Sequence, residues 1–259
     1  MNTRHHLEAS LKRLRMPGVL MNLDMRSQEE RESNLGYIDF LSLVIQDEIE
    51  QRENNNLEKR IRAARFGIEK TFEGFDFRFN DSAIPSSLIR ELATCRFIDL
   101  RQNLVIVGPP GIGKTHIAKA IGHEACRRCN SVLFKKVHGL LEKLLMTKIY
   151  PKYETLFKKC IKVDLLILDD FGFRKLEAKE AEIFYALIDE RLGNSSTIVT
   201  SNRPPQDWLN VFPDMVMGGA ILDRLVSGAQ KVIVNKAKSY RKEGPTFTRK
   251  VVDKEEKEV

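Results

Sequence analysis

A glycine-rich segment at residues 108–115 carries the clearest chemical signal in the chain. It reads GPPGIGKT and matches G-x-x-x-x-G-K-[ST], the pattern of a phosphate-binding loop, between an apolar run and a helical pattern. Its three glycines can adopt backbone conformations that other residues rarely adopt, so successive N–H groups can turn toward phosphate oxygens. Lys114 would then contact the β- and γ-phosphates of a nucleotide, and the Thr115 hydroxyl would be a ligand of Mg²⁺. The residues predicted to bind the nucleotide are Gly108, Pro109, Pro110, Gly111, Ile112, Gly113, Lys114, Thr115 and His116.

Two neighbouring aspartates end a second apolar run, residues 165–168, and are candidates for metal binding and catalysis. A carboxylate at a strand tip beside a phosphate-binding loop can hold Mg²⁺, directly or through water, and Asp169 has that place in the sequence. Asp170, one residue further on, could orient or deprotonate the water that attacks the γ-phosphate. Without the upstream loop, the pair would read as an ordinary strand-to-turn boundary. Together the two segments predict a site that hydrolyses ATP with Mg²⁺.

Three further polar residues follow later strands and helices of the predicted domain. Asn202 is expected at a strand tip, where it could place the water or respond to the nucleotide state, although turn chemistry also explains an asparagine there. Arg224 lies on an amphipathic helical segment. An arginine supplied across a subunit boundary stabilises the transferring phosphoryl group, but an ion pair with Asp223 or Asp189 is the alternative. Arg241 follows the last strand and could reach the nucleotide of its own subunit.

Short apolar runs alternate with helical patterns from residue 103 onward. That alternation is typical of an α/β domain with a parallel sheet, here one doubly wound domain flanked by helices. Ligands of such folds bind beyond the carboxyl ends of the strands, so the phosphate-binding loop and both polar strand tips are expected on one edge. The five predicted strands are 104–107, 132–134, 165–168, 197–200 and 232–234.

The region 1–68 is predicted to form a small all-helical module. Leucines at helical spacing predict a helix over residues 3–16, which Pro17 and Gly18 bring to an end. A second, longer helix is expected to begin near Leu35. Its far end is strongly basic, which suits either a solvated face or a contact surface for DNA or a partner.

Residues 71–80, TFEGFDFRFN, contain four phenylalanines that must either be buried or bury something else. Their alternation is compatible with a strand, whereas the glycine favours a linker packed over the following domain. As a linker, the segment could cover the adenine of a bound nucleotide, or its rings could simply pack together. A further helix is expected over residues 86–101, and the charged segment 246–259 is expected to be disordered.

The chain is moderately basic, with 259 residues, a net charge of +7 and a pI near 9.2. This balance suits a polyanionic partner such as DNA, although many proteins that bind no nucleic acid carry as much charge. No apolar run reaches the ~18 residues of a membrane span and no signal peptide is evident, so we expect a cytoplasmic protein without membrane contact. Cys126 and Cys129 form a lone C-x-x-C sequence, without the second pair that a zinc site needs.

Taken in order, the segments GPPGIGKT, LLILDD, TSN, ILDRL and SYR resemble the IstB/DnaC-type branch of the AAA+ ATPases over residues 70–245. A YIDFL segment in the helical N-terminal part is similar to IstB proteins, the ATP-binding helpers of insertion elements. The resemblance implies an AAA+ P-loop domain over residues 69–245 that binds ATP and Mg²⁺ and forms a homo-oligomer through its ATP sites. It also implies binding to double-stranded DNA, selection of target sites and stimulation of a partner transposase.

The same resemblance implies a role for each polar position of the site. Lys114 and Thr115 would contact nucleotide and metal, and Asp169 would be the second metal contact. Asp170 would be the catalytic acid, Asn202 the first sensor, Arg224 the arginine finger and Arg241 the second sensor. Many AAA+ enzymes have glutamate where this chain has the shorter aspartate, so we expect slow hydrolysis. The few residues after the last strand leave no room for a helical lid domain, so the nucleotide is expected to be partly uncovered.

Two functions fit such an ATPase core, and the N-terminal module distinguishes them. A DnaC-like helicase loader would share the core, but residues 1–68 contain no cysteine for the zinc module of one class of loader, which favours transposition. A binding module with an inactive site is disfavoured because the loop lysine and both aspartates are present. Contacts with DNA phosphates are expected to be weakly sequence-specific and salt-sensitive. The candidate residues for them are Lys135, Lys136, Lys143, Lys148, Lys152, Lys158 and Lys159.

Overall fold

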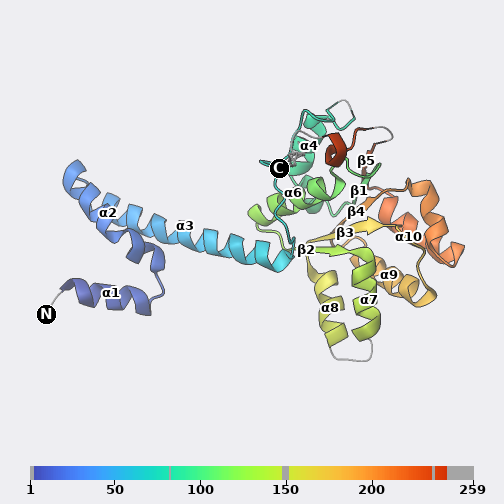
Figure 1. Ribbon diagram of the computed structural model, residues 1–259. Coiled ribbons are helices and arrows are strands. Elements are labelled where there is room, and N and C mark those ends of the chain that lie inside the picture. The colour runs from blue at the N-terminus through green and yellow to red at the C-terminus, as the bar shows by residue number, and fades with distance from the viewer. Residues whose placement is uncertain (1–2, 82, 148–151, 235–236, 244–259) are drawn as a thin grey trace, which may run out of the picture. The chain divides into compact units, whose positions relative to one another are not determined.

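The chain divides into two compact units, Met1–Arg62 and Ala63–Val259 (Figure 1). The sequence pattern placed this division somewhat later, after residue 68. The predicted disordered tail, residues 246–259, lies outside the described residues. The computed structural model describes residues 3–81, 83–147, 152–234 and 237–243.

Three helices build the N-terminal unit, and one of them was not predicted. They are α1 (Thr3–Arg13), α2 (Pro17–Ser33) and the larger part of α3 (Tyr37–Ala64). Pro17 occupies the first position of α2, where a missing N–H costs nothing because the first turn has no acceptor for it. The proline therefore marks the start of a second helix as well as the end of the first.

Helices α2 and α3 approach each other closely at Gly18. A β-carbon at that position would lie 2.5 Å from the carbonyl oxygen of Asp47, so only glycine fits without a shift. The buried carboxylate of Glu48 accepts a hydrogen bond of 2.7 Å from Gly18 N–H and thereby caps the start of α2. Asp47 accepts two hydrogen bonds from the Arg26 guanidinium, at 2.7 and 2.9 Å. The apolar core of the unit contains Leu11, Val19 and Val44.

The second unit is built on a sheet of five parallel strands, as the apolar runs predicted. Its strand order is β2-β3-β4-β1-β5, so the chain reverses its direction of winding at β1, which lies between β4 and β5. Ligand sites of open α/β sheets lie where the winding reverses, beyond the carboxyl ends of the strands. The strands are β1 (Leu104–Val107), β2 (Val132–Lys136), β3 (Leu165–Phe171), β4 (Ser196–Ser201) and β5 (Gln230–Ile233).

Helices cover both faces of this sheet (Figure 1). Helix α6 follows β1 and packs on one face together with α4, while α7, α9 and α10 pack on the other. Residues of β1, β3 and β4 that contact these helices are fully buried, which explains why each strand reads as a continuous apolar run. The helices of this unit are α4 (Ser86–Ala93), α5 (Arg96–Asp99), α6 (Lys114–Arg127), α7 (Val137–Thr147), α8 (Lys152–Lys162), α9 (Ala178–Arg191), the 3₁₀ helix η1 (Pro205–Val211), α10 (Met215–Val226) and α11 (Tyr240–Glu243).

Two segments before β1 differ in detail from the sequence-based expectation. Residues 71–80 form consecutive turns rather than a strand. The helix expected over residues 86–101 is interrupted at Cys95, whose φ of 58° lies in the left-handed region and separates α4 from α5. None of the helices in the described parts of the chain is long and apolar enough to cross a membrane.

Candidate nucleotide-binding site

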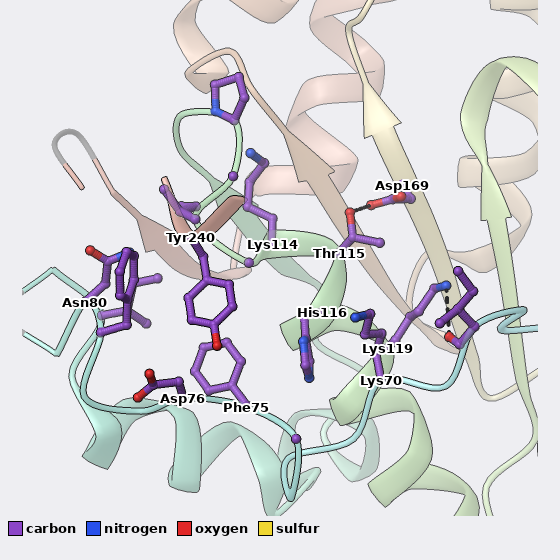
Figure 2. A pocket seen from close by; sticks show the side chains of 18 of the residues that line it. Lys70, Phe75, Asp76, Asn80, Lys114, Thr115, His116, Lys119, Asp169 and Tyr240 are labelled. Atoms are coloured by element: carbon purple, nitrogen blue, oxygen red, sulfur yellow. Dashed lines mark hydrogen bonds between the residues drawn. The ribbon is translucent and has the colours of Figure 1, made fainter. Parts of the chain in front are cut away.

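A cavity of about 430 Å³ lies at the carboxyl edge of the sheet. Its walls include the loop before α6, the first turns of α6, the tips of strands β2, β3 and β4, the linker at residues 74–80, and Tyr240 (Figure 2). A volume in this range is typical of pockets that enclose a small organic ligand. The cavity therefore lies where the motifs predicted it.

Glycines shape the loop that borders the cavity. Gly111 and Gly113 have φ values of 87° and 99°, which side chains other than glycine rarely tolerate. Gly113 directly precedes Lys114, the first residue of α6, so the unpaired N–H groups of the first helical turn face the cavity. A helix N-terminus of this kind attracts the negative charge of phosphate groups.

Lys114 connects the loop with the tip of β4. Its ammonium group donates hydrogen bonds to the carbonyl oxygens of Gly108 and Pro109, at 2.7 and 2.9 Å, and to Asn202 Oδ1 at 2.6 Å. The structure thus brings together a loop residue and a strand-tip residue that lie far apart in sequence. The Lys114 ammonium group therefore lies beside the loop, in the wall of the cavity where the phosphates of a nucleotide would bind.

Thr115 and Asp169 meet beside this lysine and form the candidate magnesium site (Figure 2). The Thr115 hydroxyl donates to Asp169 Oδ1 at 2.9 Å, and the hydroxyl of Thr200 on β4 donates to the same oxygen at 2.6 Å. Asp169 is buried, and its Oδ2 atom accepts no hydrogen bond from any described residue. Burial raises the pKa of Asp169, while the hydrogen bond from Thr200 opposes that rise. An oxygen that is buried without a donor, next to a hydroxyl, fits a hard divalent cation such as Mg²⁺.

Thr200 is a member of this site that the sequence reasoning missed. Only its place two residues before Asn202, on the strand that neighbours β3, could have indicated it. Its hydroxyl donates to Asp169 and also accepts from the backbone N–H of Asp170 at 3.1 Å. One side chain therefore orients both acidic residues.

Asp170 is directed into the cavity by an irregularity in β3. The pairing of β3 with β4 shifts between Leu168 and Phe171, and the φ of Asp170 is 60°. Such a bulge changes the direction in which the side chains at a strand end point. The Asp170 carboxylate lies 3.1 Å from the ammonium group of Lys136 at the end of β2, an ion pair that the sequence did not indicate.

Aromatic rings of the linker form the other end of the cavity. Phe75 packs edge to face against His116, with ring centroids 5.2 Å apart, and against Phe77 at 5.1 Å. His116 Nε2 lies 2.8 Å from the carbonyl oxygen of Thr71, and burial lowers the pKa of His116. The linker therefore both packs on itself and lines the cavity, so the two interpretations of its phenylalanines do not exclude each other.

A C-terminal segment closes this aromatic end. Tyr240 N–H donates to the Gly111 carbonyl at 2.9 Å, and the Tyr240 ring packs edge to face on Phe79. Asn80 exchanges two hydrogen bonds with the backbone of Lys238, at 3.0 and 3.1 Å. The backbone of Arg241 belongs to α11, but its side chain lies outside the described part of the chain. Residues 238–240 thus hold the linker against the phosphate-binding loop.

Arg224 lies away from this cavity. Its guanidinium donates to Asp189 at 2.8 Å and to the Tyr185 hydroxyl at 3.2 Å. The ion pair within one chain, which the sequence left open as an alternative, is therefore present. Arg224 borders a second cavity of about 260 Å³, together with Asn103 and Thr197 near the amino ends of β1 and β4. Within one chain it is separated from the nucleotide site by the length of the strands.

The two cysteines of the C-x-x-C sequence differ in burial. Cys126 is buried, whereas Cys129 is exposed. The C-x-x-C sequence therefore joins two thiols in different surroundings at the end of α6.

Comparisons with known proteins match most of the chain. A family model described as IstB-like ATP binding protein matches residues 9–246. An ATP-binding protein of an insertion sequence from Mycobacterium tuberculosis is 36% identical over 236 residues, which cover 91% of this chain and 93% of that protein. The corresponding protein of insertion sequence IS21 from Pseudomonas aeruginosa is 34% identical over 237 residues, which cover 92% and 89%.

Solved structures show the same fold at low sequence identity. AMPPCP-bound DnaA from Aquifex aeolicus has a TM-score of 0.55 and 22% identity, over 68% of this chain and 53% of that one. The DnaC helicase loader has a TM-score of 0.51 and 21% identity, over 66% and 99%. The second unit therefore has the AAA+ P-loop fold.

Proposed function

Because the chain belongs to the family of IstB-like ATP-binding proteins, we propose that it is an ATPase that regulates transposition. In this proposal it assembles on double-stranded DNA, selects target DNA and stimulates a partner transposase. One observation carries the ATPase assignment: Lys114, Thr115 and Asp169 converge with Asn202 at one end of a cavity of the size of a small ligand. A phosphate-binding loop with no catalytic task would not need this set of strand-tip residues.

Each polar residue of the cavity has its own role in the hydrolysis of ATP. Bound Mg²⁺, held by Thr115 and Asp169, would supply positive charge to the phosphate oxygens. Lys114 neutralises charge on the β- and γ-phosphates, and Asn202 positions the attacking water. Asp170 accepts a proton from that water as its oxygen bonds to the γ-phosphorus and the bond to the ADP oxygen breaks. Because Lys136 pairs with Asp170, the ion pair must loosen before the carboxylate can act, which supports our expectation of slow hydrolysis.

The charge on the second unit supports contact with DNA. Burial is the main reason why the pKa of Lys135 on β2 is lowered, and the nearby cations Arg65, Lys143 and Lys159 lower it further. Like charges that gather in this way repel one another, and DNA phosphates would relieve that repulsion. We therefore propose that this surface, which includes the middle of α7 and the end of α8, contacts the DNA backbone.

Substitution of Lys114 tests whether ATP binding and assembly on DNA are coupled. Lys114→Ala removes the charged donor, which we expect to weaken ATP binding about a hundredfold, since hydrogen bonds to charged groups contribute about 1.5–3 kcal/mol each. Assembly on duplex DNA should be lost with it, as measured by light scattering or sedimentation. Lys179→Ala, at an exposed position of α9, is the matched control. Normal assembly of the Lys114 variant would contradict the coupling, and tight binding to a replicative helicase would favour the helicase-loader alternative.

Mixed oligomers test whether Arg224 acts on a neighbouring subunit. Each of Arg224→Ala and Asp170→Asn should lose hydrolysis when alone, about a thousandfold for the arginine if it stabilises the transferring phosphoryl group. In a mixture, some interfaces combine the intact aspartate of one variant with the intact arginine of the other, so part of the activity should return. A mixture as inactive as its components would show that Arg224 serves only its ion pair with Asp189.

A further inference from the structure

Three lysines line the part of the cavity that lies toward β2. They are Lys70 from the segment after α3, Lys119 from α6 and Lys136 from the end of β2, and we call this part the lysine arm. Figure 2 shows Lys70 and Lys119 together, on the side of His116 that faces away from Tyr240 and Phe75. The lysine arm and the phosphate-binding loop belong to one continuous cavity.

Lys119 is the buried member of the lysine arm. Its ammonium group donates to the carbonyl oxygens of Phe66 and Ile68 and lies 4.6 Å from the centre of the Phe134 ring. None of these partners carries negative charge, and no carboxylate in the described residues forms an ion pair with Lys119. Burial lowers its pKa, and so do the charges of Lys70 and Lys136, while Asp169 opposes that effect. Positive charge in the lysine arm is therefore only partly compensated.

Lys136 and Lys70 are the exposed cations of the lysine arm. In the register of β2 and β3, Lys136 is the partner of Asp169, so it lies beside the candidate magnesium site. Its ammonium group contacts Asp170 at 3.1 Å. The Lys136 side chain is 68% exposed and can therefore turn toward a different anion. Lys70 is exposed, and no described carboxylate forms an ion pair with it.

We propose that the lysine arm is a binding site for a phosphate anion, and that it receives the inorganic phosphate released from ATP. The source of that anion rests on the proposed ATPase function. ADP would stay on the loop, which holds its remaining phosphates, while the detached group would move to the lysines that line the same cavity. An ammonium group binds such an oxyanion through short, charge-assisted hydrogen bonds.

Lys136 links the lysine arm to the catalytic end of the cavity, because its exposed ammonium group contacts Asp170 at 3.1 Å. A phosphate anion released beside Asp170 can replace that carboxylate as the partner of the Lys136 ammonium group. Because Lys119 is buried at the wall of the lysine arm, a small free anion fits this site better than the backbone of a DNA duplex.

The test is a calorimetric titration of inorganic phosphate into the full-length protein saturated with ADP and Mg²⁺. We expect phosphate to bind the wild-type protein in addition to ADP. The double variant Lys70→Gln, Lys136→Gln should bind it at least about tenfold more weakly, since two charge-assisted hydrogen bonds are lost. Lys179→Gln removes one exposed charge outside the cavity and should bind phosphate as the wild-type protein does. ADP affinity should stay unchanged in all three proteins, since the loop is intact.

The outcomes separate this inference from the ATPase proposal. Failure of the wild-type protein to bind phosphate, or equal binding by the double variant, would overturn the lysine arm even if ATP is hydrolysed. If a short DNA duplex displaces the phosphate, the lysine arm is a site for DNA phosphates and the assignment to the product is wrong. If phosphate binds as expected but ATP is not hydrolysed, the phosphate site stands and the ATPase proposal fails.

Discussion

Replacement of Thr200 by valine isolates the contribution of one hydroxyl group to the candidate magnesium site. Valine has nearly the same shape, so at this fully buried position the main change is the loss of the hydroxyl group. The change removes the donor at 2.6 Å from Asp169 and leaves the backbone N–H of Asp170 without its acceptor at 3.1 Å. Among the described residues, the Thr115 hydroxyl would then be the only donor left on the Asp169 carboxylate.

The expected decrease in the free energy of unfolding follows from these two contacts. A hydrogen bond to a charged group contributes about 1.5–3 kcal/mol, and an unsatisfied buried N–H costs about 1–3 kcal/mol, so a combined loss of about 3 kcal/mol is a fair estimate. In a domain of this size such a loss lowers the melting temperature by about 6–12 °C. The loss should shrink toward acid pH. Burial raises the pKa of Asp169 above its ordinary 3.8, so protonation sets in above that pH and leaves a neutral carboxyl that needs the donor less.

Thermal unfolding at neutral and acid pH measures this effect, and a titration of Mg²⁺ in the presence of ADP measures its consequence for the metal. Thr200→Ser is the matched control, because it keeps the hydroxyl and loses only a methyl group, at about 1 kcal/mol. Equal stability of the valine variant and the wild-type protein, or an equal loss in both variants, would refute the role that we assign to the hydroxyl.

Two further perturbations address the loop and the N-terminal unit. Gly111→Ala should weaken ADP binding, because a β-carbon would lie 2.1 Å from Ser239 Oγ and displace the C-terminal segment. Gly193→Ala shares the positive φ but has no atom within 4 Å, so equal ADP affinities in the two variants would contradict this reasoning. In the N-terminal unit, hydrogen bonds from Arg26 hold the pKa of Asp47 below its ordinary 3.8. These hydrogen bonds therefore stabilise the folded unit above pH 3.8, and that stabilisation is lost as the pH falls through the lowered pKa. Hydrogen exchange of α2, corrected for intrinsic rates, should show that loss, and Asp47→Asn should show no such pH dependence.

Much of the fold was predictable because buried parallel strands leave a local signature. All five apolar runs became strands, and the strand ends differed from the runs by only a few residues. Helix α2 was missed because Pro17 and Gly18 read as a helix end, although proline is equally suited to a first helical turn. The role of Gly18 depends on its contact with Asp47, a residue far along the chain, which no local pattern could reveal.

The candidate site was predictable where its residues are part of a motif. Loop residues and strand-tip aspartates have recognisable neighbours in sequence, and the structure brings Lys114, Thr115 and Asp169 together. Thr200 and Lys136 have no such neighbours, since their importance comes from pairing across the sheet. The bulge in β3 that aims Asp170 at the cavity also depends on its pairing with β4.

By itself, the sequence determined that a phosphate-binding loop follows a buried strand and that two acidic residues end another. These features depend on backbone freedom and on burial, which a few neighbouring residues control. Only the tertiary structure decided which strands lie side by side. Because β4 lies between β1 and β3, Lys114 meets Asn202 and Thr200 meets Asp169, whereas Arg224 is left at the opposite edge with Asp189. Strand order depends on how the connecting helices pack on the two faces, and that is a property of the whole chain.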